Sequence, residues 1–166
     1  TLNAGRDYYA LYCSLESVQP FTDPDKGIPA ILDAIRMAIE FHPALSEFSV
    51  DYNALLNRSA AAMVRLLLVR ICSQLDRPLV LLFDEADRLS NGTLIAFLRQ
   101  LRDGYVNRVR TPFIHSLALV GMRNIRDYKV RVRDDRETLG SAIPFNIVTE
   151  VLTLSDFTRE EVVELY

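Results

Sequence analysis

Two acidic residues, Asp84 and Glu85, directly follow a run of five apolar residues at 79–83. A carboxylate at Asp84 offers the oxygen ligands that a hydrated Mg²⁺ prefers, and it can bind the ion directly or through water. A carboxylate at Glu85 can accept a proton from a water molecule that attacks a phosphoryl group. An arbitrary Asp-Glu pair more often caps a loop or begins a helix, so the case for chemistry depends on the elements that position the pair.

The apolar run before the pair predicts a strand that is buried on both faces. It is too short for a helix, and its residues do not alternate with polar ones. Other segments with the composition of strands lie at residues 8–15, 116–121 and 145–154. Apolar residues at steps of three and four predict helices at residues 28–41, 59–75 and 91–102. Strands that alternate with helices predict an α/β fold with three layers around a mainly parallel sheet.

Three polar side chains are expected at one edge of this sheet. Ligands of parallel sheets bind beyond the carboxyl ends of the strands. Asp84 and Glu85 occupy that position after one predicted strand, and Arg123 follows the strand at 116–121. An arginine at such a position is equally compatible with a solvated or ion-paired residue.

Residues 79–89, Leu-Val-Leu-Leu-Phe-Asp-Glu-Ala-Asp-Arg-Leu, resemble the Walker B strand of AAA-type and related P-loop ATPases. Residues 119–128 resemble the sensor-1 strand of a bacterial AAA-like ATPase group. Residues 144–147 and 152–161 resemble that group's next strand and the entry to its helical lid. The resemblance implies that residues 1–155 form a partial AAA-like ATPase core and that residues 156–166 begin the lid.

The resemblance also implies a role for each candidate residue. Asp84 would be the carboxylate associated with magnesium, Glu85 the base that polarises the attacking water, and Arg123 the sensor of the γ-phosphate. ATP and Mg²⁺ would be the ligands of the parent protein, which would use hydrolysis to drive a conformational switch.

One part of the family pattern is absent from the chain. The glycine-rich phosphate loop ends in Lys-Ser or Lys-Thr, and neither Lys26 nor Lys129 follows glycines at that spacing. We expect this loop and its strand to precede Thr1, so the chain is interpreted as a truncated core that is inactive alone and binds no nucleotide. Without the missing strand, the strand at 117–120 is expected to be exposed, to pair with the strand at 147–154, or to pair with a second copy of the chain. Self-association would follow from the last of these.

Composition narrows the remaining classes of function. The formal net charge of -3 argues against a protein whose main task is to bind nucleic acid, although it leaves local basic patches open. No apolar run reaches the roughly 20 residues that cross a bilayer. The two cysteines lie far apart in apolar runs and are expected to be buried thiols, which favours a cytoplasmic protein.

A second interpretation is a non-catalytic α/β binding module. In this case the acidic pair would only cap a helix, and the charged loop at 123–137 would contact protein or nucleic acid. The basic residues of this loop are interleaved with acidic ones, which is also typical of a solvated loop.

Overall fold

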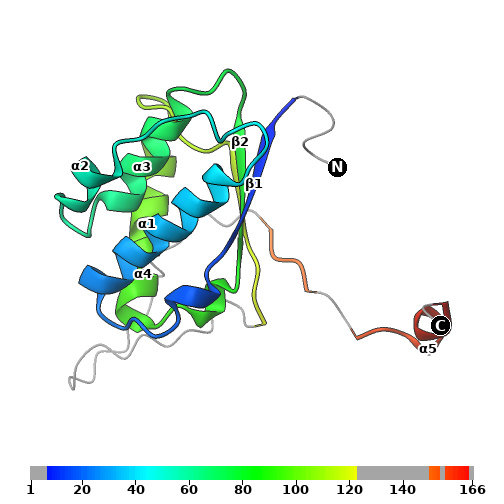
Figure 1. The fold of residues 1–166 in the computed structure, drawn as a ribbon. Coiled ribbons are helices and arrows are strands. Elements are labelled where there is room, and N and C mark those ends of the chain that lie inside the picture. Colours follow the sequence, from blue (N-terminus) through cyan, green and yellow to red (C-terminus); the bar gives the residue numbers. More distant parts are fainter. Residues whose placement is uncertain (1–6, 123–149, 154–155, 165–166) are drawn as a thin grey trace.

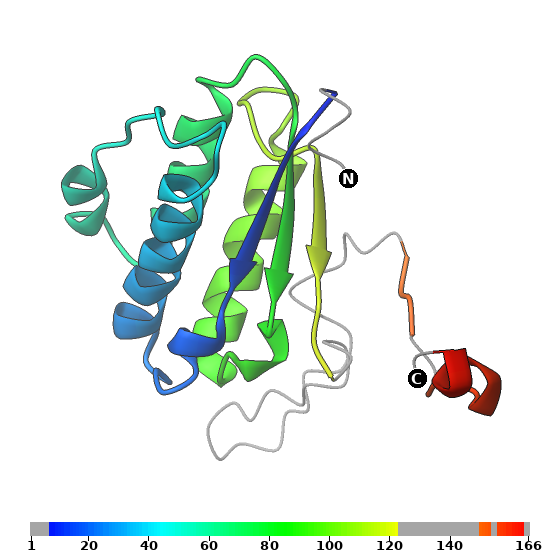
Figure 2. The ribbon, with the colours of Figure 1, turned by 45° about the vertical axis from the view of Figure 1, so that its right-hand side comes forward.

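A parallel three-stranded sheet is the centre of the computed structural model, which describes residues 7–122, 150–153 and 156–164. The strands β1 (Tyr9–Ser14), β2 (Leu79–Asp84) and β3 (Ser116–Leu119) lie in the order β1-β2-β3, so β2 is central. Figure 2 shows the three strands side by side and pointing the same way. The predicted α/β fold with a parallel sheet is therefore confirmed for this part of the chain.

Helices connect the strands, and their starts and ends differ from the predicted ranges. The first begins earlier than expected, because Asp23 accepts a hydrogen bond from the Asp25 N–H and Pro24 occupies the first helical turn. The helices and 3-10 turns are η2 (Glu16–Val18), α1 (Pro24–Glu40), α2 (Tyr52–Leu56), α3 (Met63–Cys72), η3 (Ala86–Arg88), α4 (Asn91–Val106) and α5 (Arg159–Glu164).

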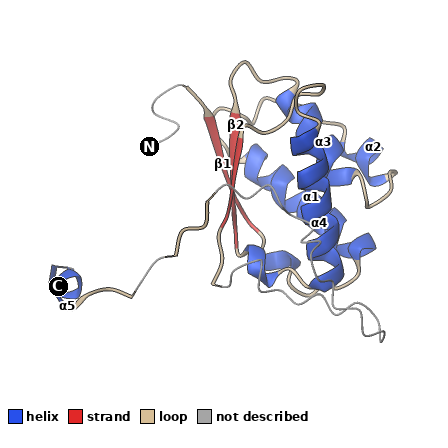
Figure 3. Ribbon diagram, turned by 180° about the vertical axis from the view of Figure 1, so that it is seen from behind, coloured by secondary structure: helices blue, strands red, loops and turns tan. Residues whose placement is uncertain are grey.

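The helices α1, α3 and α4 all lie on the same face of the sheet (Figure 3). Burial along β2 alternates accordingly, since Leu79, Leu81 and Phe83 are buried, whereas Val80 and Leu82 are partly exposed. The prediction of a strand buried on both faces is therefore wrong for the described residues. These residues form two layers instead of three, because none of α1–α4 covers the second face, which we call the uncovered face.

The predicted strand at 145–154 is not found in its described part. Residues 150–153 have no regular secondary structure, and the rest of the segment lies outside the described residues. Val151 and Leu152 are 48% and 80% exposed, so this stretch lacks the burial that a strand of the core has.

The two cysteines are free thiols, as the sequence predicted. Cys13 is buried under the helices, and Cys72 is half-buried at the end of α3. Burial disfavours the charged thiolate and raises the pKa of each thiol to about 12. Among the described residues, no helix combines the length and the apolar character that a membrane crossing requires.

Candidate active site at the carboxyl ends of the strands

Asp84 is the last residue of the central strand, and two hydrogen bonds fix its carboxylate. The Tyr12 hydroxyl donates to Oδ2 at 2.7 Å, and the Glu85 N–H donates to Oδ1 at 2.9 Å. By strand alternation, Asp84 lies on the same face of β2 as Val80 and Leu82, which is the uncovered face. Its side chain is thus held at the sheet edge without being covered by the helices.

Tyr12 reaches Asp84 from the neighbouring strand. In the parallel register Tyr12 pairs with Leu82 and Ser14 pairs with Asp84, so the phenol is a diagonal neighbour of the carboxylate. The hydrogen bond to Asp84 raises the pKa of Tyr12, because ionisation would remove the donated proton beside a carboxylate. The sequence does not single out Tyr12, because the register that pairs β1 with β2 cannot be read from it.

Glu85 turns the chain sharply after the strand. Its φ of 58° and ψ of 29° are in the left-handed region, and it is the sole non-glycine residue with positive φ in the described part of the chain. Such a conformation costs an L-residue roughly 1–2 kcal/mol and occurs often at functional sites. Backbone hydrogen bonds hold the turn from both sides, from Leu15 N–H to Asp84 O and from Ala86 N–H to Val120 O, each 3.0 Å.

The Glu85 carboxylate is ion-paired in this structure. Arg88 Nε lies 2.6 Å from Glu85 Oε2, and this bond raises the pKa of the Arg88 guanidinium. This bond occupies one oxygen of the candidate base, so Arg88 competes with a water molecule for Glu85 Oε2. Arg88 is, after Tyr12, the second residue near the site that the sequence resemblance did not assign.

Asp87 adds a further carboxylate at the same edge. Its side chain lies against Gly121, which follows β3, and a Cβ at that position would overlap the Asp87 carboxylate. Glycine at 121 therefore permits the close approach of the turn after β2 to the chain after β3.

Arg123 lies outside the described residues. That Arg123 lies close to Asp84 and Glu85 therefore stays a prediction. The alternative that the loop at 123–137 contacts a partner also stays a prediction. The structure does place the chain just before Arg123 at the same sheet edge as Asp84 and Glu85. The backbone hydrogen bond from Ala86 N–H to Val120 O holds these two segments together.

The carboxylates fit a magnesium ion that arrives with phosphate. No group of three or more His, Cys, Asp or Glu side chains that could hold a metal is present in the described residues. Asp84 has about four lone-pair positions and uses two of them for the Tyr12 hydroxyl and the Glu85 N–H, so it can still bind a water of a hydrated ion. Mg²⁺ commonly keeps several waters and binds one or two carboxylates together with substrate phosphates.

Comparison with known proteins identifies no relative. No protein-family model, no curated protein and no solved structure matches the chain. The function assigned to this edge therefore depends on the placement and contacts of its residues.

Proposed function

We propose that the chain is part of an ATPase core in which Asp84 associates with the Mg²⁺ of bound ATP and Glu85 activates the attacking water. The observation that carries this proposal is the position of both carboxylates at the carboxyl end of the central strand of a parallel sheet. This end is where ligands bind in open α/β sheets. The Tyr12 bond supports the role of Asp84, because it fixes the carboxylate before a ligand arrives.

Two features of the sheet support the expected position of a phosphate loop. Parallel sheets are almost always covered on both faces, and α1–α4 leave one face of this sheet uncovered. No described strand pairs with the outer edge of β3, which is therefore open to a further strand. We propose that residues encoded before Thr1 supply that strand, its phosphate loop and a helix for the uncovered face. In the chain as it stands, a second copy can cover the open edge and the uncovered face, but it cannot supply the phosphate loop.

The test uses the polypeptide extended before Thr1 through its phosphate loop. We expect this protein to bind ATP in the presence of Mg²⁺ and to hydrolyse it. Glu85→Gln keeps the shape of the side chain but cannot act as a base, so it should retain ATP binding and lower kcat by about 10²–10⁴-fold. Glu47→Gln is the matched control, because Glu47 is exposed in the connection between α1 and α2.

Two results would count against the proposal. An extended protein that ignores ATP at millimolar concentration favours the binding module. Hydrolysis that survives Glu85→Gln as well as it survives Glu47→Gln removes Glu85 from the chemistry. Isothermal titration calorimetry and phosphate release measure the two quantities separately.

A further inference from the structure

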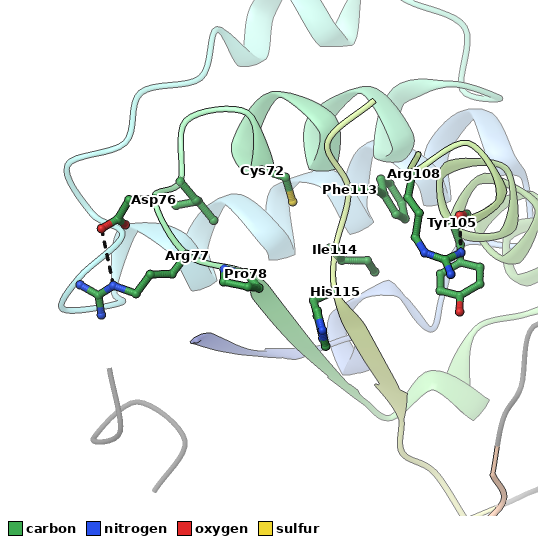
Figure 4. A pocket seen from close by; sticks show the side chains of 10 residues that line it. Cys72, Asp76, Arg77, Pro78, Tyr105, Arg108, Phe113, Ile114 and His115 are labelled. Carbon is green, nitrogen blue, oxygen red and sulfur yellow. Dashed lines mark hydrogen bonds and ion pairs between the residues drawn. The ribbon is translucent and has the colours of Figure 1, made fainter. Parts of the chain in front are cut away.

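A groove of about 620 Å³ lies at the end of the sheet opposite to Asp84 and Glu85, beside the starts of β2 and β3 (Figure 4). Three segments build it: the connection from α3 to β2, the end of α4, and the connection from α4 to β3. Its floor includes the apolar side chains of Cys72, Phe113 and Ile114. The volume lies within the range of about 300–1,000 Å³ that is usual for ligand sites.

Two arginines lie on opposite sides of this floor (Figure 4). The Arg77 guanidinium carbon is 4.8 Å from the ring centroid of Tyr9, and that of Arg108 is 3.6 Å from the ring centroid of Tyr105. Arg108 Nη1 also donates to the backbone oxygen of Tyr105 at 2.8 Å. Stacking on a ring restricts each guanidinium, and a guanidinium with five N–H donors keeps several for a ligand.

One carboxylate lies beside the Arg77 guanidinium, on the side of the groove away from Arg108 (Figure 4). Asp76 Oδ2 is 3.6 Å from Arg77 Nε, while Asp76 Oδ1 accepts a hydrogen bond from the Tyr9 hydroxyl at 2.8 Å. The Tyr9 bond holds the pKa of Asp76 below its usual range, so this group is ionised at neutral pH. The lining of the groove thus carries two guanidiniums and one carboxylate, so its net charge is positive. The formal net charge of the whole chain, in contrast, is -3.

We propose that this groove binds an acidic peptide segment of a partner protein. An apolar side chain of the segment would lie on the floor, and carboxylates on either side of it would pair with Arg77 and Arg108. Arginine and aromatic side chains beside an apolar centre are the composition of protein-binding surfaces. A nucleic-acid backbone fits less well, because it needs many phosphate contacts and the chain is acidic overall. The proposal is independent of the ATPase proposal, since the two sites are at opposite ends of the strands.

The probe is a fluorescein-labelled hexapeptide, Glu-Asp-Leu-Phe-Asp-Glu, and the measurement is fluorescence anisotropy with the chain as it exists. We expect saturable binding, and we expect Arg77→Gln and Arg108→Gln each to weaken it about tenfold through loss of a charge-assisted hydrogen bond. Arg58→Gln is the matched control, because Arg58 is exposed before α3 and outside the groove. It should leave the dissociation constant unchanged.

Two peptide changes test the same site without altering the protein. Replacing the four acidic residues with lysine should abolish binding, and replacing Leu-Phe with Ser-Ser should weaken it by about tenfold or more through loss of apolar burial. The proposal is overturned if the acidic probe does not bind at millimolar protein, if the lysine peptide binds equally, or if both arginine variants bind like Arg58→Gln. Competition by a single-stranded oligonucleotide at lower concentration than the unlabelled peptide would reassign the groove to nucleic acid.

Discussion

The left-handed backbone of Glu85 is a source of strain at a single residue. Glu85→Gly and Glu85→Ala both remove the ion pair with Arg88, but only glycine adopts a φ of 58° without a steric penalty. We therefore expect the glycine variant to have a free energy of unfolding about 1 kcal/mol higher than the alanine variant. Urea denaturation followed by circular dichroism measures the difference.

The same pair of substitutions at Glu16 provides the control. Glu16 begins η2 and is not among the residues with positive φ, so glycine there should be less stable than alanine. Opposite signs at the two positions would identify backbone strain at Glu85. A Glu85→Gly variant that is less stable than Glu85→Ala, by as much as at position 16, would show that the turn carries no strain.

At the scale of single residues, the sequence predicted where Asp84 and Glu85 lie but not what they touch. An apolar run that ends in two acids marks the end of a strand, and the structure has β2 ending at Asp84. The partners Tyr12 and Arg88 could not be predicted, because one depends on strand register and the other on the left-handed turn. The assignment of catalytic roles to these carboxylates stays a prediction.

One buried side chain joins two helices. Gln100 of α4 accepts from the Val64 N–H at 2.9 Å and donates to Ala60 O at 2.9 Å, which ties it to the start of α3. Gln100→Leu would leave these buried backbone groups without a partner, and each costs about 1–3 kcal/mol. We expect a loss of roughly 2–4 kcal/mol in the free energy of unfolding, measured by urea denaturation.

Gln74→Leu is the matched control for this substitution. Gln74 follows α3, and its amide donates to Arg70 O at an exposed position, where water can replace the bond. The change should alter stability by no more than about 0.5 kcal/mol. Equal effects at the two positions would show that the Gln100 hydrogen bonds do not hold α3 against α4.

At the scale of elements, periodicity predicted the helices better than it predicted their ends or the burial of the strands. The apolar residues that predicted a helix at 28–41 form the buried face of α1. The helix α4, however, continues past its predicted end at residue 102 to Val106. Gly104 lies within the helix, and it permits the close packing of Phe113, because a Cβ at this position would overlap the Phe113 ring. The run at 79–83 could not reveal that only one of its faces is covered, since tertiary packing decides that α1, α3 and α4 all lie on the same side of the sheet.

At the scale of the whole molecule, the uncovered face is apolar near the candidate site. Leu82 is paired with Tyr12 on one side and Ala118 on the other, and none of these three side chains is fully buried. An incompletely covered parallel sheet with an unpaired edge favours association with another chain. A protein with this arrangement should bury the face when its concentration rises.

Self-association is therefore the prediction that belongs to the whole chain. We expect the sedimentation coefficient to rise with protein concentration, and Ala118→Lys to weaken association at least about tenfold by placing a charge on the uncovered face of β3. Ala61→Lys adds the same charge at an exposed turn before α3 and should associate like the unsubstituted protein. A chain that stays monomeric at all concentrations, or an Ala118→Lys variant that associates normally, would show that this face does not mediate contacts between copies.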